Sequence, residues 1–322
     1  MERREKWFWW LMAVLALLLL AAGMVQVTRQ DWSARQNEGR RKFGAVYMTL
    51  NNPFYVIVDE EIRTSVENHG DVLISRDPAL SVERQKAEIR ELIEMGCQVL
   101  FVNPVDWHEL APVLEIARQA GVPVIAIDTN VDDDSLVAST VVSDNYMAGV
   151  QCAKHLISLV PGGQVALLKH DQARSSVDRI KGFRDTLAAY PDFHVVAEAE
   201  CQGQLELAMP AMAGMLREHP DINIVMALND PAAMGALAAL QQAGRLDSVL
   251  VYGVDGAQEA RDMIAQGHMA ATAVQAPRRM GQMAVEQAYR ILAGEQPEPL
   301  LQLPTKLLTR ENAATEVFEA WE

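Results

Sequence analysis

The chain has 322 residues, half of them hydrophobic, and a formal net charge of −15 at pH 7. This length and composition suit two domains of ordinary size with buried cores, and they exclude a disordered chain. After residue 42 the sequence carries 20 Lys and Arg against 39 Asp and Glu, a net charge of −19. Because so acidic a surface repels nucleic acid and anionic lipid, no nucleic-acid partner is predicted.

Residues 7–27, WFWWLMAVLALLLLAAGMVQV, are almost entirely apolar and follow Arg3, Arg4 and Lys6. A helix of this length spans about 30 Å of hydrocarbon, with the basic residues retained in the cytoplasm. We interpret the segment either as an N-terminal transmembrane helix that anchors the protein or as a cleaved signal peptide. The polar stretch 28–42 is interpreted as a tether. Both interpretations place the rest of the chain outside the cytoplasm, in the periplasm or at the outer face of the cell membrane.

From residue 43 onward, short apolar runs alternate with amphipathic patterns, an order typical of parallel sheets covered by helices on both faces. The predicted strands are 43–49, 71–75, 98–102, 123–127, 137–142, 164–168, 193–198, 223–227, 248–253, 270–275 and 301–308. The predicted helices are 54–69, 81–95, 107–120, 145–159, 176–190, 205–218, 231–244, 257–266 and 278–293. One sheet of so many strands would be unusually wide, so we expect an α/β protein with two doubly wound domains.

The three cysteines, Cys97, Cys152 and Cys201, stand singly in or beside apolar stretches. They lack the spacing of metal ligands, and an odd number leaves at least one unpaired. We interpret them as three separate small hydrophobic residues. No metal and no cofactor are predicted.

Short amides or carboxylates follow six of the predicted strands. In open parallel sheets, ligands bind beyond the carboxyl ends of the strands. Each such residue alone is also explained as a helix cap or a turn residue, but together they converge on one cleft if the two domains face each other. In chain order they are Asn52, Asn103, Asp128, Asn229, Asp255 and Gln275.

A cleft with these groups suits an uncharged polyol, because amides and carboxylates donate and accept hydrogen bonds to hydroxyls. Phe54 and Tyr55 add flat apolar faces for the C–H surface of a sugar ring. Arg179, in SSVDRIKGF, offers a forked donor to neighbouring hydroxyls, or else faces solvent on its helix.

Eight ordered stretches resemble the ribose- and galactose-type periplasmic sugar-binding proteins of ATP-binding-cassette (ABC) importers. They are TLNNPFY, FVNPVD, GVPVIAIDT, SDNYMAG, RIKGF, ALNDPAAMGAL, YGVDG and TAVQAP, and the similarity as a whole covers residues 43 to about 310. The resemblance implies the type I periplasmic binding protein fold, two lobes joined by a hinge of three strands that cross near residues 142–144, 272–275 and 304–306. The implied lobes are 43–142 plus 275–304 and 143–274 plus 305–322.

The resemblance also implies the ligand contacts. Those of the first lobe are Asn52, Phe54, Tyr55, Asn103 and Asp128, and those of the second are Arg179, Asn229, Asp255 and Gln275. Three departures disfavour ribose itself and leave another monosaccharide or a related polyol. Thr129 stands where ribose binders carry an arginine, Met48 replaces a small polar residue, and residues 202–204 lack the expected aromatic side chain.

We therefore expect an extracytoplasmic solute-binding protein that clamps a pentose, a hexose or a related polyol and delivers it to the permease of an ABC importer. The alternative is a membrane-anchored sugar sensor that presents its ligand-bound state to a sensor histidine kinase. Enzyme activity is not predicted, because His170-Asp171 and the acidic run 132–134 are interpreted as loop residues and phosphate-binding loop motifs are absent. A sugar-responsive repressor of the same fold is disfavoured by the membrane segment and the acidic charge.

Overall fold

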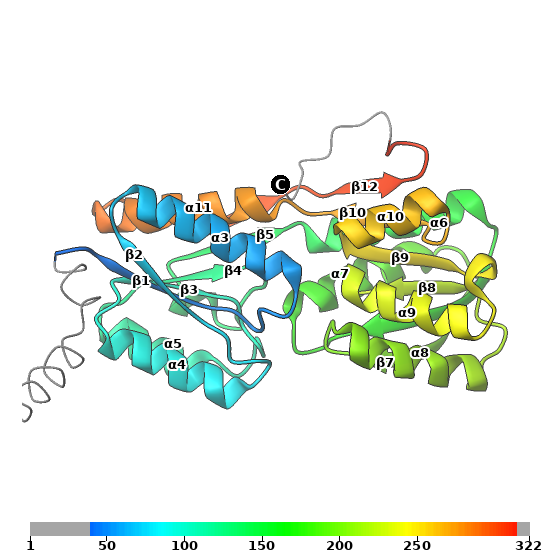
Figure 1. The fold of residues 1–322 in the computed structure, drawn as a ribbon, viewed down its shortest axis with the longest axis horizontal. Coiled ribbons are helices and arrows are strands. Elements are labelled where there is room, and N and C mark those ends of the chain that lie inside the picture. The colour runs from blue at the N-terminus through cyan, green and yellow to red at the C-terminus, as the bar shows by residue number, and fades with distance from the viewer. Residues whose placement is uncertain (1–38, 314–322) are drawn as a thin grey trace, which may run out of the picture. The chain divides into compact units, whose positions relative to one another are not determined.

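The computed structural model describes residues 39–313, and those from Arg41 onward belong to one compact unit that contains two six-stranded sheets (Figure 1). The strand order of the first sheet is β11 (Leu300–Leu303), β5 (Ser139–Ser143), β4 (Val124–Ile127), β3 (Val99–Val102), β1 (Lys42–Val46) and β2 (Val72–Arg76). That of the second is β12 (Lys306–Thr309), β10 (Ala271–Val274), β9 (Leu250–Asp255), β8 (Ile224–Ala227), β6 (Gly163–Lys169) and β7 (Phe193–Glu200). Both orders are doubly wound, as expected from the sequence.

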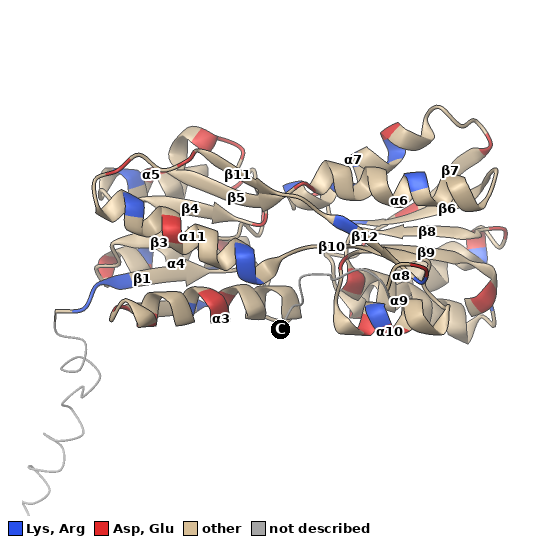
Figure 2. Ribbon diagram, turned by 90° about the horizontal axis from the view of Figure 1, so that it is seen from above, with Lys and Arg blue, Asp and Glu red and all other residues tan. Residues whose placement is uncertain are grey.

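Helices cover both faces of each sheet, and each sheet with its helices is called a lobe below. The first lobe has α3 (Pro53–Asn68) and α11 (Pro277–Leu292) side by side on one face, and α4 (Val82–Glu94) and α5 (Ala111–Gln119) on the other (Figure 1). The second lobe has α6 (Asn145–Leu159), α7 (Arg174–Leu187), α8 (Leu205–Glu218), α9 (Asp230–Gln242) and α10 (Gln258–Gln266). Charged residues lie mainly on helices and loops, whereas the strands are largely uncharged (Figure 2).

The central strands are buried on both faces, which explains their continuous apolar sequences. Every residue of β3, β4, β8 and β10 is buried. Parallel sheets require this pattern, because their crossover helices cover both faces. Each sheet therefore lies between two hydrophobic clusters. The three cysteines are buried and free within these layers, and the interpretation as small hydrophobic residues is confirmed.

The last predicted strand, 301–308, is wrong as a single element. It divides at Pro304 and Thr305 into β11, which pairs in parallel with β5, and β12, which pairs antiparallel with β10. The direction of β12 follows from the crossing: β10 runs toward the other lobe, whereas β12 starts from that lobe and runs away from it. The chain thus passes between the sheets after β5, β10 and β11, and the exact limits predicted for the lobes stay a prediction.

Three other predicted boundaries are also wrong. Lys42, assigned to the tether, begins β1 and pairs with Val72. The same strand ends at Val46 rather than at residue 49, and the amide of Met48 donates to the side-chain Oδ1 of Asn103 (3.0 Å). The predicted helix 107–120 begins only at Ala111, because residues 103–110 form a loop.

The predicted transmembrane helix, residues 7–27, and nearly all of the tether lie outside the described residues. Within residues 39–313, no helix combines the length and the apolar character needed to cross a membrane.

Helices α6 and α7 approach closely through two glycines. A Cβ on Gly149 would overlap the carbonyl oxygen of Arg179, and a Cβ on Gly182 would overlap that of Tyr146. The contact fixes the height of α7 over the sheet, and with it the backbone of Arg179.

We predict that Gly149→Ala lowers the free energy of unfolding by about 1–3 kcal/mol, because the added methyl group meets backbone that cannot rotate away. Chemical denaturation of both proteins measures the change. Gly214→Ala in α8 is the matched control, since its Cβ would have ordinary contacts only, and it should raise stability by roughly 0.5–1 kcal/mol. Equal effects of the two substitutions would contradict this account of the packing.

The two lobes touch along a seam formed by the loop 103–110 of the first lobe and the loop 170–175 of the second. The backbone amide of Trp107 donates to the carbonyl of Gln172 (3.1 Å), and its Nε1 donates to that of Asp171 (3.4 Å). The guanidinium of Arg174 lies 5.0 Å from the centre of the Trp107 ring. These contacts hold the lobes together at one end of the cleft.

We predict that Trp107→Ala shifts the ligand-free protein toward a more open conformation. It removes one hydrogen bond and one cation–π contact, together worth about 1–2 kcal/mol. Distances between spin labels on α4 and α8 should lengthen or broaden. Tyr190→Ala, which changes an exposed aromatic residue at the α7–β7 turn, should leave the distances unaltered. Identical distance distributions in wild type and Trp107→Ala would count against the seam.

Candidate ligand-binding site

A cavity lies between the lobes, where the carboxyl ends of the parallel strands of both sheets meet. Eight of the nine predicted site residues line it: Asn52, Phe54, Tyr55, Asp128, Arg179, Asn229, Asp255 and Gln275. In this closed conformation only about 20 Å³ is open to the centre of a water molecule, enough for about one. A monosaccharide therefore enters only if the lobes separate.

The ninth predicted residue, Asn103, does not line the cavity. Its Oδ1 accepts from the amide of Met48 (3.0 Å), and its Nδ2 donates to the carbonyl of Ile127 (3.1 Å). The same Nδ2 lies 3.5 Å from Oδ2 of Asp128. Asn103 thus joins the ends of three neighbouring strands and supports Asp128 from behind.

Asp128 forms the centre of the first-lobe wall. Its φ of 66° lies in the left-handed region, and the amide of Thr129 donates to the carbonyl of Ile127 (2.7 Å) across it. The tight turn directs the carboxylate away from the strand, and the hydroxyl of Tyr55 donates to its Oδ2 (3.1 Å). Positive φ at a non-glycine residue costs roughly 1–3 kcal/mol and is concentrated at functional sites.

Arg179 crosses from the second lobe toward the first. Its Nε donates to Oδ1 of Asn145 (2.8 Å) and its Nη1 donates to the carbonyl of Leu228 (3.0 Å). The guanidinium lies 3.7 Å from Oδ1 of Asp255 and 3.9 Å from Oδ1 of Asp128. With 4% of its surface exposed, Arg179 does not face solvent.

Asp255 is the last residue of β9, has a φ of 136° and accepts from Nε2 of Gln275 (2.7 Å). The turn after it is held by Asp230, whose Oδ2 accepts from the amides of Gly256 and Ala257 (both 2.8 Å). Its Oδ1 accepts from the hydroxyl of Thr272 (2.7 Å). Asp230 therefore positions the Asp255 carboxylate.

Asn52 and Asn229 are helix caps that also line the cavity. Oδ1 of Asn52 accepts from the amide of Phe54 (2.9 Å) at the start of α3. Oδ1 of Asn229 accepts from the amide of Ala232 (3.0 Å) at the start of α9, and its Nδ2 donates to the carbonyl of Gly203 (3.1 Å). Both asparagines therefore cap a helix, and both also lie where they can contact a ligand in the cavity.

The charged side chains buried at or directly behind the cavity wall are one guanidinium, that of Arg179, and the three carboxylates of Asp128, Asp230 and Asp255. Burial raises the pKa of Asp128 and raises that of Asp255 well above its ordinary value, while the positive charge of Arg179 lowers both. Burial also raises the pKa of Asp230 to about 6. Isolated carboxylates are costly to bury, so the carboxyl groups hold protons more tightly than they do in water.

A carboxylate oxygen and an amide oxygen remain open as acceptors in the cavity wall. Among the described residues, Oδ1 of Asp128 and Oε1 of Gln275 are buried without a hydrogen-bond partner. Buried polar atoms are normally paired, so each is a point where a ligand hydroxyl would gain a hydrogen bond that the protein does not supply. The arrangement can hold an uncharged, hydroxyl-rich molecule.

Several lining residues were missed in the sequence. They are Met48, His170, Ala173, Ser175, Gln202, Gly203, Gln204 and Leu228. His170 directly follows β6, so the rule that identified Asp128 and Asp255 would have identified it as well. The sequence interpretation of His170-Asp171 as loop residues alone is therefore wrong for His170.

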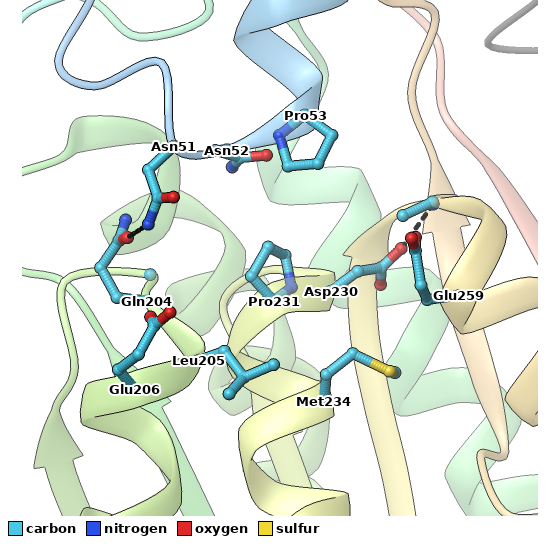
Figure 3. Close-up of a pocket in the computed structure, with 12 residues that line it drawn as sticks. Asn51, Asn52, Pro53, Gln204, Leu205, Glu206, Asp230, Pro231, Met234 and Glu259 are labelled. Atoms are coloured by element: carbon cyan, nitrogen blue, oxygen red, sulfur yellow. Dashed lines mark hydrogen bonds between the residues drawn. The ribbon is translucent and has the colours of Figure 1, made fainter.

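A second hollow, a groove of about 230 Å³, shares Asn52, Gly203 and Gln204 with the cavity. Asn51 of the first lobe faces Gln204 of the second across it, and Nδ2 of Asn51 donates to Oε1 of Gln204 (3.0 Å; Figure 3). Pro231 and Met234 form part of its floor. The groove is larger than the cavity, but Arg179, Asp128 and Asp255 do not line it, so we take the cavity as the candidate site.

Comparison with known proteins gives consistent likenesses. The family model of the periplasmic binding protein domain matches residues 43–296. The ribose import binding protein of Bacillus subtilis (strain 168) is 31% identical over 302 residues, which cover 92% of this chain and 97% of that protein. The D-apiose import binding protein of Actinobacillus succinogenes is 29% identical over 75% of this chain and 79% of its own.

A solved ABC transporter solute-binding protein from Mycobacterium smegmatis, with bound glycerol, matches with a TM-score of 0.82 and 31% identity, over 88% of this chain and 98% of that one. The Caulobacter myo-inositol binding protein bound to myo-inositol gives 0.80 and 29%, over 85% and 94%. These matches confirm the family expected from the sequence: the chain belongs to the type I periplasmic sugar-binding proteins of ABC importers.

Proposed function

We propose that this protein binds a monosaccharide or a related polyol between its lobes and delivers it to the permease of an ABC importer. The observation that carries the proposal is the convergence of eight predicted residues, from strand ends and helices of both lobes, on one buried polar cavity. Family membership supports the same role, because the relatives are import binding proteins for ribose and for D-apiose. The protein acts by binding and release, without turnover.

The proposed mechanism is closure of two lobes on the ligand. Asp128 belongs to the first lobe, whereas Arg179 and Asp255 belong to the second, so a molecule that contacts all three stabilises only the closed form. A ligand shifts such an equilibrium by its difference in affinity between the two conformations. The sugar would lie between the carboxylates of Asp128 and Asp255. It would then replace some of the contacts that these carboxylates make with Arg179.

The proposed ligand is a monosaccharide or polyol other than ribose. Thr129, where ribose binders carry an arginine, accepts from the amide of Ser175 (2.9 Å) across the lobes and does not line the cavity. Met48 lines it with a thioether that lies 3.4 Å from the hydroxyl of Tyr55. The cavity wall therefore has one guanidinium group fewer and one apolar contact more than the wall of a ribose site.

We further propose that residues 7–27 anchor the protein at the outer face of the membrane, on the strength of their apolar sequence. Delivery to an importer is compatible with an anchor or with a cleaved signal. The sensor-kinase alternative depends on the anchor, and no contact in the described part of the chain favours it.

Asp255→Asn should weaken binding of the sugar roughly 10- to 100-fold, because the substitution replaces one of two buried carboxylate oxygens with an NH2 group that cannot accept a hydrogen bond from a ligand hydroxyl. Titration calorimetry with the best ligand from a thermal-shift screen of pentoses, hexoses and cyclitols measures the loss. Asp185→Asn is the control, since that carboxylate is exposed on α7 beside Lys181 and Tyr146. Affinity within threefold of wild type for Asp255→Asn would contradict the proposed site.

The full-length chain should remain in the membrane pellet after extraction with alkaline carbonate, because an apolar helix of 21 residues is retained in the bilayer. A chain that begins at residue 29 should appear in the soluble fraction. Recovery of the native protein in the supernatant with a shortened N-terminus would show a cleaved signal peptide instead.

A further inference from the structure

His170 is a buried side chain of the cavity wall that the predicted ligand set does not include. It directly follows β6, has 2% of its surface exposed and lines the cavity. Its backbone amide donates to the hydroxyl of Ser176 (2.9 Å), which fixes the residue at the start of α7. Both ring nitrogens are buried and have no hydrogen-bond partner in the part of the chain that the structure describes.

The unpaired ring nitrogens are not explained if His170 serves only to pack the core. Buried polar atoms are satisfied in most proteins, and leaving one unpaired costs about 1–3 kcal/mol. The nearest carboxylate oxygen, Oε2 of Glu200, lies 3.7 Å from Nδ1, which is beyond hydrogen-bond length. That carboxylate is itself half-exposed, and its other oxygen accepts from the amide of Asp171 (3.1 Å).

The ring is neutral near pH 7. Burial lowers the pKa of His170, although the negative charges of Asp106 and Asp171 act in the opposite direction. A neutral imidazole has one nitrogen that donates and one that accepts. Hydroxyl groups can satisfy both, since each hydroxyl donates one hydrogen bond and accepts others.

The loop of His170 is also held against the first lobe when the cleft is closed. The carbonyl of Gln172 accepts from the amide of Trp107 (3.1 Å), and the amide of Ser175 donates to Oγ1 of Thr129 (2.9 Å). Closure therefore fixes the imidazole relative to both walls of the cavity. Residues 202–204, where an aromatic side chain was expected, add no ring to this lobe.

From these contacts we propose that His170 is a ligand-contacting, specificity-determining residue whose ring nitrogens form hydrogen bonds with hydroxyls of the bound sugar or polyol. This inference depends on the proposed function. It assigns to the second lobe a polar ring that selects ligands by the position of their hydroxyl groups.

The test is calorimetric titration of full-length wild type and His170→Phe with D-ribose, D-allose, L-arabinose, D-apiose and myo-inositol, and with deoxy analogues of the best ligand. Phenylalanine keeps a ring but removes both nitrogens. If that variant does not fold, as judged by its thermal transition, His170→Ala is measured in its place. His155→Phe is the matched control, because His155 lies on α6 outside the cavity, with its Nδ1 beside the hydroxyl of Tyr252 (3.1 Å).

We expect the variant at position 170 to bind the best ligand about tenfold more weakly than wild type, which corresponds to the loss of about one buried hydrogen bond. At least one deoxy analogue should bind both proteins within twofold, because it lacks the hydroxyl that the imidazole contacts. An unchanged affinity, or a loss that persists for every deoxy analogue, would overturn the proposed role of His170. The proposed function would still stand. If wild type binds none of the five compounds, the proposed function fails, and this inference fails with it.

Discussion

The closed arrangement depends on one buried charge group, in which the guanidinium of Arg179 lies between Asp128 of one lobe and Asp255 of the other. A buried charge is tolerated only when it is paired and hydrogen-bonded, and breaking such a pair by removing one partner is strongly destabilising. Much of the surrounding structure supports this group. The glycine contact between α6 and α7 sets the arginine backbone, Asn145 fixes its Nε, and Asp230 holds the turn that carries Asp255.

This group also explains why uncharged ligands suit the cavity. A cationic guest would compete with the arginine, and an anionic guest would meet two carboxylates whose pKa values are already raised by burial. A hydroxyl-rich guest adds donors and acceptors without net charge. It can therefore exchange contacts with the arginine and the carboxylates without changing the net charge of the site.

The sequence predicted the two sheets, the nine α-helices of residues 39–313 and half of the residues that line the cavity, because strand ends are visible as apolar runs that stop at a polar residue. It could not show that Asn103 stands behind the wall, since that depends on which neighbouring strand ends its amide reaches. The sequence also could not show that β12 runs antiparallel to β10. That direction follows from the passage of the chain between the lobes and not from any local pattern. His170 was visible in principle, but an imidazole at a strand end was not sought.

The division of the C-terminal stretch between the sheets has a consequence for how the protein acquires its structure. The first lobe needs β11, and the second needs β12, although Thr140 of β5 and its partner Leu300 of β11 are 160 positions apart in the chain. Each sheet lacks one of its two edge strands, β11 or β12, until residues 300–309 have been synthesised. The lobes therefore cannot be completed one after the other as the chain emerges, because this one segment completes both.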